Sequence, residues 1–253
     1  MNFDIQKAGM YKRISAFLFD IIMLGIAIVG AGLLLSEALN YEKRLNVLNE
    51  DYARYEKKYN VSFEMTNEQY NQMSPEKRAD FDEAYMALSS DKEVMGHYTM
   101  IMNLTLVIVS ISVLAGYLIM EFAVPLCLKN GQTLGKKIFG IAVIHTGGIR
   151  ITPLLLFIRT VLGKYTLETM VPLFIIMMIF FNSIGIIGAV ILGLILLVQL
   201  ILVIATPTNS FLHDILAKTV VVDLQSQMIF DNGAKLLEYK KKLHAEEVSN
   251  KDY

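Results

Sequence analysis

Polar and charged side chains that could carry chemistry stand inside or beside the long apolar segments of this chain. Six of them stand out: Arg13, Asp20, Glu121, Arg159, Gln199 and Asp214. Arg13 opens the apolar run RISAFLFD, in which Asp20 follows seven residues later. A charge at the centre of a bilayer costs about 2.5–3.5 kcal/mol on insertion scales, so groups of this kind should be paired or neutral.

Three of these residues, Asp20, Glu121 and Gln199, are expected at a similar depth, about 10–12 Å inside one end of their helices at 1.5 Å per residue. Two interpretations stay open. In one, transport depends on Asp20 and Glu121, which bind protons or cations along a path through the protein. In the other, a structural network clamps the loop motifs onto the membrane helices and consists of Arg13, Asp20, Glu121, Arg159 and Asp214.

A second polar pattern runs along one apolar segment. Asn103, Ser110 and Tyr117 repeat at intervals of seven, and Glu121 lies one helical turn beyond Tyr117. Lipid offers no hydrogen-bond partners, so this polar stripe should face the protein interior.

The composition indicates a membrane protein. Apolar residues make up 54% of the chain and Trp is absent, and a helix needs roughly 20 apolar residues to cross the hydrocarbon core. Four segments are long enough, although the third is the shortest: 14–35, 99–128, 165–182 and 185–205. The first follows Lys12 and Arg13 but is too long for a cleaved signal peptide, so we expect an uncleaved anchor.

The remaining composition excludes several classes. The net charge is -1, which gives no reason to expect a nucleic-acid partner. Cys127 is the single cysteine, and the four histidines are scattered without metal-ligand spacing. No phosphate loop or nucleophile motif occurs. We therefore expect no enzymatic activity, no cofactor and no metal.

The distribution of charge predicts the orientation. The stretch 122–167 has no acid but contains Lys129, Lys136, Lys137, Arg150, Arg159 and Lys164, whereas 36–98 has 13 acids against 8 bases. The positive-inside tendency places the first stretch in the cytoplasm and the second outside. Four crossings then put both termini in the cytoplasm of a multi-pass protein of the cell membrane.

The outer segment 36–98 has the pattern of a helical hairpin. Its first helix shows a heptad seam of Tyr41, Leu45, Leu48, Tyr52, Tyr55 and Tyr59, and its returning helix an apolar stripe of Phe81, Tyr85, Leu88 and Met95. Thr66 and Ser74 are good N-caps, and Pro75 fits a first helical position. The stripe either packs on its own partner helix or offers a docking face to another protein.

Two stretches on the cytoplasmic side resemble one another. The first stretch continues into a predicted short β-hairpin, in which a Gly-Gly turn separates Ile141–His145 from 149–152. We expect an interfacial helix over 153–163 to follow. TLGKKIFGIAVI from Thr133 and SFLHDILAKTVV from Ser210 share small, Ile and Val positions. This predicts an internal repeat in which each stretch is a helical turn leading into a strand.

The same residues resemble the RDD family of bacterial membrane proteins. That family has an Arg at the head of its first helix, an Asp within that helix and a second Asp near the end, which Arg13, Asp20 and Asp214 match in order. Two further segments match: Gly131, Thr133, Leu134, Gly135, Lys136, Lys137 and Gly140; and His213, Asp214, Ala217 and Thr219. The resemblance implies a multi-span membrane protein with a suspected role in transport, including cation/proton exchange. The long outer segment departs from the family pattern.

The sequence thus predicts an all-α membrane protein: a four-helix transmembrane bundle with a two-fold internal repeat, an extracytoplasmic helical hairpin and short cytoplasmic β-hairpin elements. The expected divisions are 1–35, 36–98, 99–128, 129–164, 165–206, 207–223 and 224–253, of which the last is a charged cytoplasmic tail. The leading function is transport coupled to protons or cations such as Na⁺, and a thin bundle suggests a homo-oligomer. The alternative is an accessory or scaffold protein whose outer hairpin binds a partner.

Overall fold

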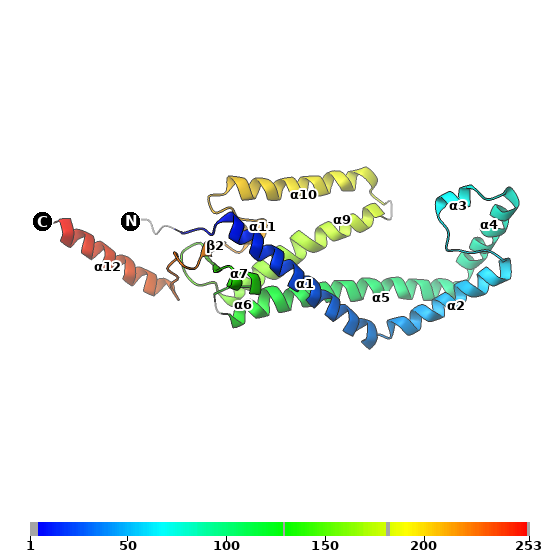
Figure 1. Cartoon of the computed structure of the whole chain (residues 1–253), viewed down its shortest axis with the longest axis horizontal. Coiled ribbons are helices and arrows are strands. Elements are labelled where there is room, and N and C mark those ends of the chain that lie inside the picture. The colour runs from blue at the N-terminus through cyan, green and yellow to red at the C-terminus, as the bar shows by residue number, and fades with distance from the viewer. Residues whose placement is uncertain (1–4, 129, 181–182, 252–253) are drawn as a thin grey trace. The chain divides into compact units, whose positions relative to one another are not determined.

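The structure, a computed structural model, describes residues 5–128, 130–180 and 183–251. The expected end of the third span at 181–182, Lys129 and the two chain ends lie outside the described residues. The described part is mostly helical, with four long apolar helices and a small two-stranded antiparallel sheet (Figure 1). The chain divides into two compact units, the first formed by 1–28 with 113–253 and the second by 29–112.

The second unit contains the predicted helical hairpin. It comprises the end of α1 (Met10–Ala38), α2 (Tyr41–Tyr59), α3 (Asn67–Asn71), α4 (Pro75–Ser90) and the start of α5 (Lys92–Tyr117). Thr66 caps α3, and Ser74 caps α4 with Pro75 at its start, as predicted. Four residues of the predicted seam, Tyr41, Leu45, Tyr52 and Tyr55, pack against a core of Leu48, Leu88, Val94 and Ile101.

The returning stripe is partly wrong. Phe81 contacts Phe63 and Tyr70, and Leu88 is buried, but Tyr85 and Met95 are exposed. Asp91 ends α4 and accepts hydrogen bonds from the first backbone N–H groups of α5. This break changes the helical phase, so Val94 and Ile101 are buried in place of Met95.

Two of the long helices contain π-helical turns. The helix Lys92–Cys127 consists of α5, a π segment Leu118–Ala123 and α6 (Val124–Cys127). The helix Pro153–Phe180 consists of α8 (Pro153–Phe157), a π segment Ile158–Met170 and α9 (Val171–Phe180). The fourth long helix is α10 (Gly185–Ala205). The helix predicted over 153–163 does begin at Pro153, but it is not a separate element, because it continues without a break to Phe180.

Both π segments end just before a proline, Pro125 or Pro172. Proline has no N–H, and its ring clashes with the carbonyl four residues earlier. A widened turn relieves that clash, and π-helical turns are frequent at functional sites. These segments carry Glu121, Arg159 and other charged residues of the site.

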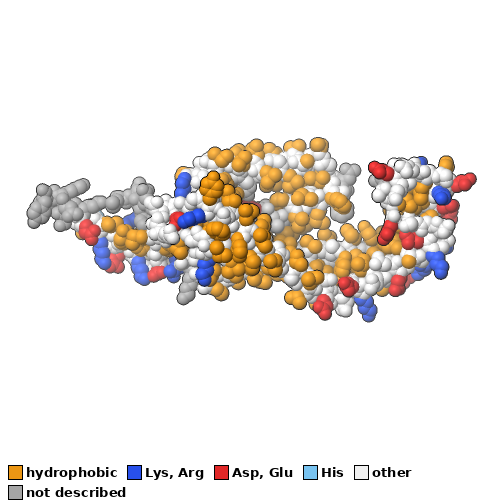
Figure 2. All heavy atoms as spheres, in the orientation of Figure 1, with side chains coloured by type: hydrophobic (Ala, Val, Ile, Leu, Met, Phe, Trp, Pro, Cys, Tyr) orange, Lys and Arg blue, Asp and Glu red, His pale blue; other side chains and the backbone are white. Residues whose placement is uncertain are grey.

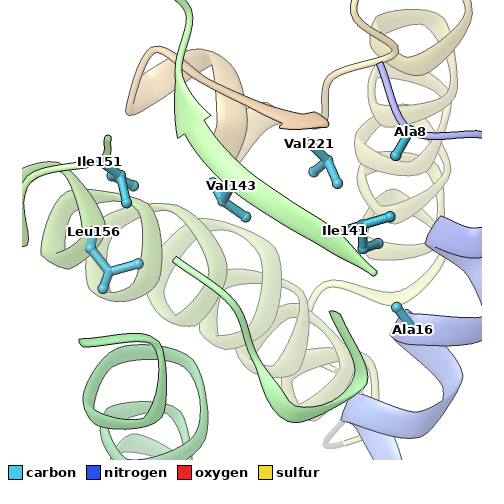
Figure 3. Packing of buried hydrophobic residues seen from close by; sticks show 7 residues of the cluster. All are labelled: Ala8, Ala16, Ile141, Val143, Ile151, Leu156 and Val221. Atoms are coloured by element: carbon cyan, nitrogen blue, oxygen red, sulfur yellow. The ribbon is translucent and has the colours of Figure 1, made fainter. Parts of the chain in front are cut away.

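The small sheet joins two distant parts of the sequence. Strand β1 (Ile141–His145) pairs antiparallel with β2 (Thr219–Asp223), from Ile141↔Asp223 to His145↔Thr219. The predicted β-hairpin of 141–145 with 149–152 is wrong, since only one isolated bridge, Ile144↔Arg150, joins them. Figure 3 shows Ile141, Val143 and Val221 in an apolar core with Ala8, Ala16, Ile151 and Leu156. A strand buried in this way needs a long apolar partner, which 149–152 cannot supply because Pro153 begins a helix.

The two similar stretches do have the predicted shape. Helix α7 (Leu134–Ile138) leads through Gly140 into β1, and α11 (Leu212–Leu216) leads through Lys218 into β2. Gly140 and Lys218 both have positive φ, at 65° and 51°. The short helices begin at Leu134 and Leu212, so these two residues match in the structure. The sequence comparison matched Thr133 with Ser210, which pairs Leu134 with Phe211, so the two alignments differ by one residue. The tail forms α12 (Gly233–Lys251).

Candidate functional site

A cavity of about 580 Å³ in the first unit collects most of the charged residues of the membrane helices. Four acids and four bases line it: Asp20, Glu121, Glu168 and Asp214; Arg13, Lys136, Arg159 and Lys164. Gln199 and His213 complete its polar wall. All six residues selected from the sequence therefore border one cavity, and the charges balance when the acids are ionised and His213 is neutral.

Asp20 holds the beginning of α7. Its Oδ1 accepts the Gly135 N–H at 2.8 Å, and its Oδ2 accepts the Thr133 hydroxyl and lies 3.4 Å from Lys136 Nζ. A carboxylate at a helix N-terminus satisfies free N–H groups and opposes the helix dipole. We call Asp20, Thr133, Gly135 and Lys136 the first clamp. The buried acid is thus offset by hydrogen bonds and by Lys136.

Glu168 holds the beginning of α11 in the same way. Its Oε1 accepts the His213 N–H at 3.0 Å, and its Oε2 lies 2.7 Å from His213 Nδ1. Gln199 donates to Glu168 at 3.0 Å and accepts the Leu212 N–H at 3.2 Å. We call Glu168, Gln199, Leu212 and His213 the second clamp. The sequence reasoning missed Glu168, although it is the single acid in the expected third span.

Each clamp depends on one glycine at the point of closest approach. A Cβ on Gly135 would collide with the carbonyl oxygen of Ala16 on α1. A Cβ on Gly163 would lie 2.8 Å from the Cα of His213. In the first clamp the glycine belongs to the short helix, and in the second to the membrane helix. Gly131 has a separate role, since its φ is 60° and a Cβ there would lie 2.7 Å from the Val143 carbonyl oxygen.

The second clamp continues into a larger ion-pair network. Arg159 Nε donates to Asp214 Oδ1 at 3.0 Å, and its Nη2 lies 3.0 Å from His213 Nε2. Arginine can only donate, so Nε2 accepts and the imidazole proton is on Nδ1, facing Glu168. His213 is therefore neutral in this arrangement. Burial lowers the pKa of His213 below its ordinary value, although Asp214 raises it.

Asp214 is fixed as a buried anion. Burial by itself would raise the pKa of Asp214, but the charge of Arg159, followed by His213, holds it well below its usual range. The Thr219 hydroxyl adds a hydrogen bond of 2.9 Å from the first residue of β2. Asp214 therefore joins the third span to the sheet, consistent with its expected structural role.

Glu121 completes the network from the π segment of the second span. Its Oε1 lies 2.6 Å from Lys164 Nζ, and its Oε2 is 4.0 Å from Arg159 Nη1. That Oε2 atom is buried and has no hydrogen-bond partner among the described residues. Lys164, expected from the sequence in the cytoplasmic stretch before the third span, instead lies within the third long helix, where its side chain is half-buried beside Glu121.

Arg13 does not pair with Asp20. Its Nη1 donates to the Thr208 carbonyl at 3.3 Å, and within the described ranges no carboxylate lies within 4.0 Å of it. Lys136, not Arg13, Glu121 or Arg159, is the ionic partner of Asp20. Lys136 is buried, whereas Lys137 is exposed. The rise along α1 explains the outcome, since seven residues separate Arg13 from Asp20 by about 10 Å.

The predicted polar stripe is continuous only at one end. Tyr117 hydrogen-bonds Thr169 at 2.8 Å in the first unit. In the second unit Ser110 is half-buried, but Asn103 is exposed and does not face the interior. In this unit Thr105 hydrogen-bonds Tyr41, and Ser112 donates to the Ile108 carbonyl. A spacing of seven did not distinguish these faces of α5.

Comparison with known proteins identifies the family. The model of the RDD family matches residues 7–218, which include both clamps and the ion-pair network. No curated protein and no solved structure matches the chain. Within the described residues, no group of three His, Cys, Asp or Glu side chains could hold a metal ion. The four apolar helices and the family match together show that this chain is a multi-span membrane protein of the RDD family.

Proposed function

We propose that this protein transports a small solute or ion in exchange with protons or cations, with Glu121 as the titrating carboxylate. The observation that carries the proposal is the Oε2 atom of Glu121, which is buried beside the cavity and has no hydrogen-bond partner in the part of the chain that the structure describes. A carboxylate in such a place can bind a proton or a cation, but not both at once. Competition for one oxygen is a minimal device for exchange.

The neighbours of Glu121 support this role. Lys164 and Arg159 face its carboxylate, and Arg159 also holds Asp214 and His213. A proton on Glu121 would leave Lys164 and Arg159 with one anion fewer, so their side chains would shift toward other partners. Asp20, in contrast, has partners on both oxygens and acts as a structural clamp in this proposal.

The orientation and assembly also belong to the proposal. We place both termini and the loop 129–152 in the cytoplasm, because that loop holds Lys129, Lys136, Lys137 and Arg150 and no acid. The acidic segment 36–98 then lies on the outer side of the cell membrane, which the protein spans. We expect a homo-oligomer. An accessory role through the hairpin has less support, since the tyrosine seam packs within its own unit. The similar clamps favour an internal duplication.

Flux in proteoliposomes tests the proposal. Purified protein is reconstituted with a pH-sensitive dye inside, and Na⁺ or K⁺ is added outside at fixed pH. We expect proton release with the wild type and none with Glu121→Gln, which keeps an oxygen to accept from Lys164. Glu37→Gln, an exposed acid on α1, is the matched control and should retain flux. Flux that persists in Glu121→Gln would contradict the assignment.

A further inference from the structure

The cavity has a second character besides its charges. One wall is apolar and belongs to two membrane helices, with Ile14, Phe17 and Ile21 on α1 and Leu196 and Val203 on α10. Leu196 is 70% exposed and Phe17 59% exposed, and both lie on apolar spans. Figure 2 shows apolar side chains over both helices. The cavity therefore borders the lipid, and its size is that of a site for one drug-sized ligand or one lipid chain.

Two basic residues at or near this wall have no carboxylate within 4.0 Å among the described residues. Three of the four lining bases, Lys136, Arg159 and Lys164, have a carboxylate within 4.0 Å, but Arg13 has none in the described part of the chain. Lys7 is similar, since its Nζ donates to the Pro207 carbonyl and to Asn209 Oδ1, at 3.3 and 3.2 Å, and has no carboxylate partner among the described residues. Lys7 and Arg13 thus meet the same loop, which follows α10.

The position of these cations suits a lipid headgroup. Arg13 lies in the first turn of α1, where the apolar span begins, and most of its five N–H donors have no partner among the described residues. A guanidinium binds phosphate oxygens in a bidentate way. We propose that Arg13 and Lys7 bind the phosphate of an anionic phospholipid, one acyl chain of which lies in the cavity between α1 and α10.

The absence of Trp from the chain makes a site-specific test practical. Leu196→Trp places an indole in the cavity wall, and Leu194→Trp places one on another face of α10, since two residues are about 200° apart around a helix. Each protein is reconstituted in vesicles of phosphatidylcholine with a fraction of brominated lipid. The brominated lipid is either phosphatidic acid or phosphatidylcholine, and bromine quenches an indole that it contacts.

With Leu196→Trp we expect brominated phosphatidic acid to quench more than brominated phosphatidylcholine, with an apparent preference of about fivefold per basic residue. Leu194→Trp should show no such preference. Arg13→Gln should remove most of the preference, and Lys7→Gln, an exposed position that folding should tolerate, should reduce it. Inorganic phosphate at millimolar concentration should not displace the lipid.

Three outcomes would overturn the proposal. These are equal quenching by the two lipids at Leu196→Trp, a preference unchanged in both Arg13→Gln and Lys7→Gln, and loss of the preference on adding inorganic phosphate, which would indicate a site for a free anion. None of these readouts depends on flux, so the lipid site and the proposed transport function stand or fall separately.

Discussion

The two clamps of the first unit have the same plan but different chemistry. In each, a carboxylate from a membrane helix accepts the N–H of the second residue of a short helix, Gly135 or His213, and that helix leads into one strand of the sheet. In the first clamp the carboxylate is satisfied by Thr133 and Lys136. In the second, its other oxygen faces an imidazole.

The glycine explains why the chemistry can differ. The short helix of the first clamp approaches α1 so closely that residue 135 must be glycine. In the second clamp Gly163 on the membrane helix supplies the space, so the matching position on the short helix can hold His213. That side chain links Glu168 to Arg159, and through Arg159 to Asp214 and Glu121. Among the described residues, no hydrogen bond or ion pair joins the first clamp to this ion-pair network, whereas the second clamp is joined to it through His213.

The largest expected effect comes from breaking the first clamp. Asp20→Leu removes the partner of buried Lys136 and of the Gly135 N–H, and a broken buried pair costs about 3–5 kcal/mol. We expect a loss of that size in the free energy of unfolding, measured by thermal or denaturant unfolding in detergent. Asp20→Asn retains an acceptor and should lose less. An Asp20→Leu protein as stable as the wild type would show that this clamp has no structural role.

The next largest effect tests whether each clamp needs its glycine, which is on the short helix in the first clamp and on the membrane helix in the second. Gly135→Ala and Gly163→Ala each force a methyl group into backbone or Cα atoms, and overpacking costs about 1–3 kcal/mol. The control is Gly193→Ala in α10, where a Cβ meets no atom within 4 Å and which should be neutral or slightly stabilising. Thermal stability in one detergent compares all three. If Gly163→Ala behaved like Gly193→Ala, the two clamps would not be equivalent in packing.

The smallest effect distinguishes the clamps by pH. Burial lowers the pKa of His213 in the folded chain below its value in the unfolded chain, about 6.5. At pH values between these two pKa values, the unfolded chain binds a proton that the folded chain does not. Stability should therefore fall as pH drops through that window, by at most about 1.4 kcal/mol per pH unit. Glu168, Arg159 and Asp214 face this imidazole.

The comparison of His213→Gln with wild type isolates this contribution, because Gln can both donate to Glu168 and accept from Arg159. The pH dependence of the thermal midpoint between about pH 7.5 and 5.5 should become shallower. His244→Gln, on the exposed face of α12, should leave it unchanged. An identical slope in wild type and His213→Gln would mean that His213 takes up no proton in this range.

Much of this arrangement could be predicted from the sequence, for identifiable reasons. Long apolar runs specify the spans, caps such as Thr66 and Ser74 mark helix starts, and the expense of a buried charge singled out Asp20 and Glu121. Pairing across the chain could not be read from local pattern. The partner of β1 is β2 and not 149–152, and the ionic partner of Asp20 is Lys136 on α7.

Two residues of the site, Glu168 and Lys164, were missed although the sequence contained a signal for each. Glu168 is an acid in an apolar span, as Asp20 is, and the same argument applies to it. Lys164 was counted among the bases of the cytoplasmic stretch, yet it lies within the third long helix, where Glu121 compensates its charge. A base and an acid in neighbouring spans can cancel, so a lone charge is a weak marker of a helix end.

The central claim is a division of roles, in which Asp20 clamps the fold and Glu121 titrates. The most direct test measures thermal stability in detergent and cation-driven proton flux in liposomes for Asp20→Asn and Glu121→Gln side by side. We predict that Asp20→Asn is less stable than wild type but keeps its flux, and that Glu121→Gln still folds and inserts but has no flux. A stable, correctly inserted Asp20→Asn protein without flux would contradict this division and make Asp20 a transport carboxylate.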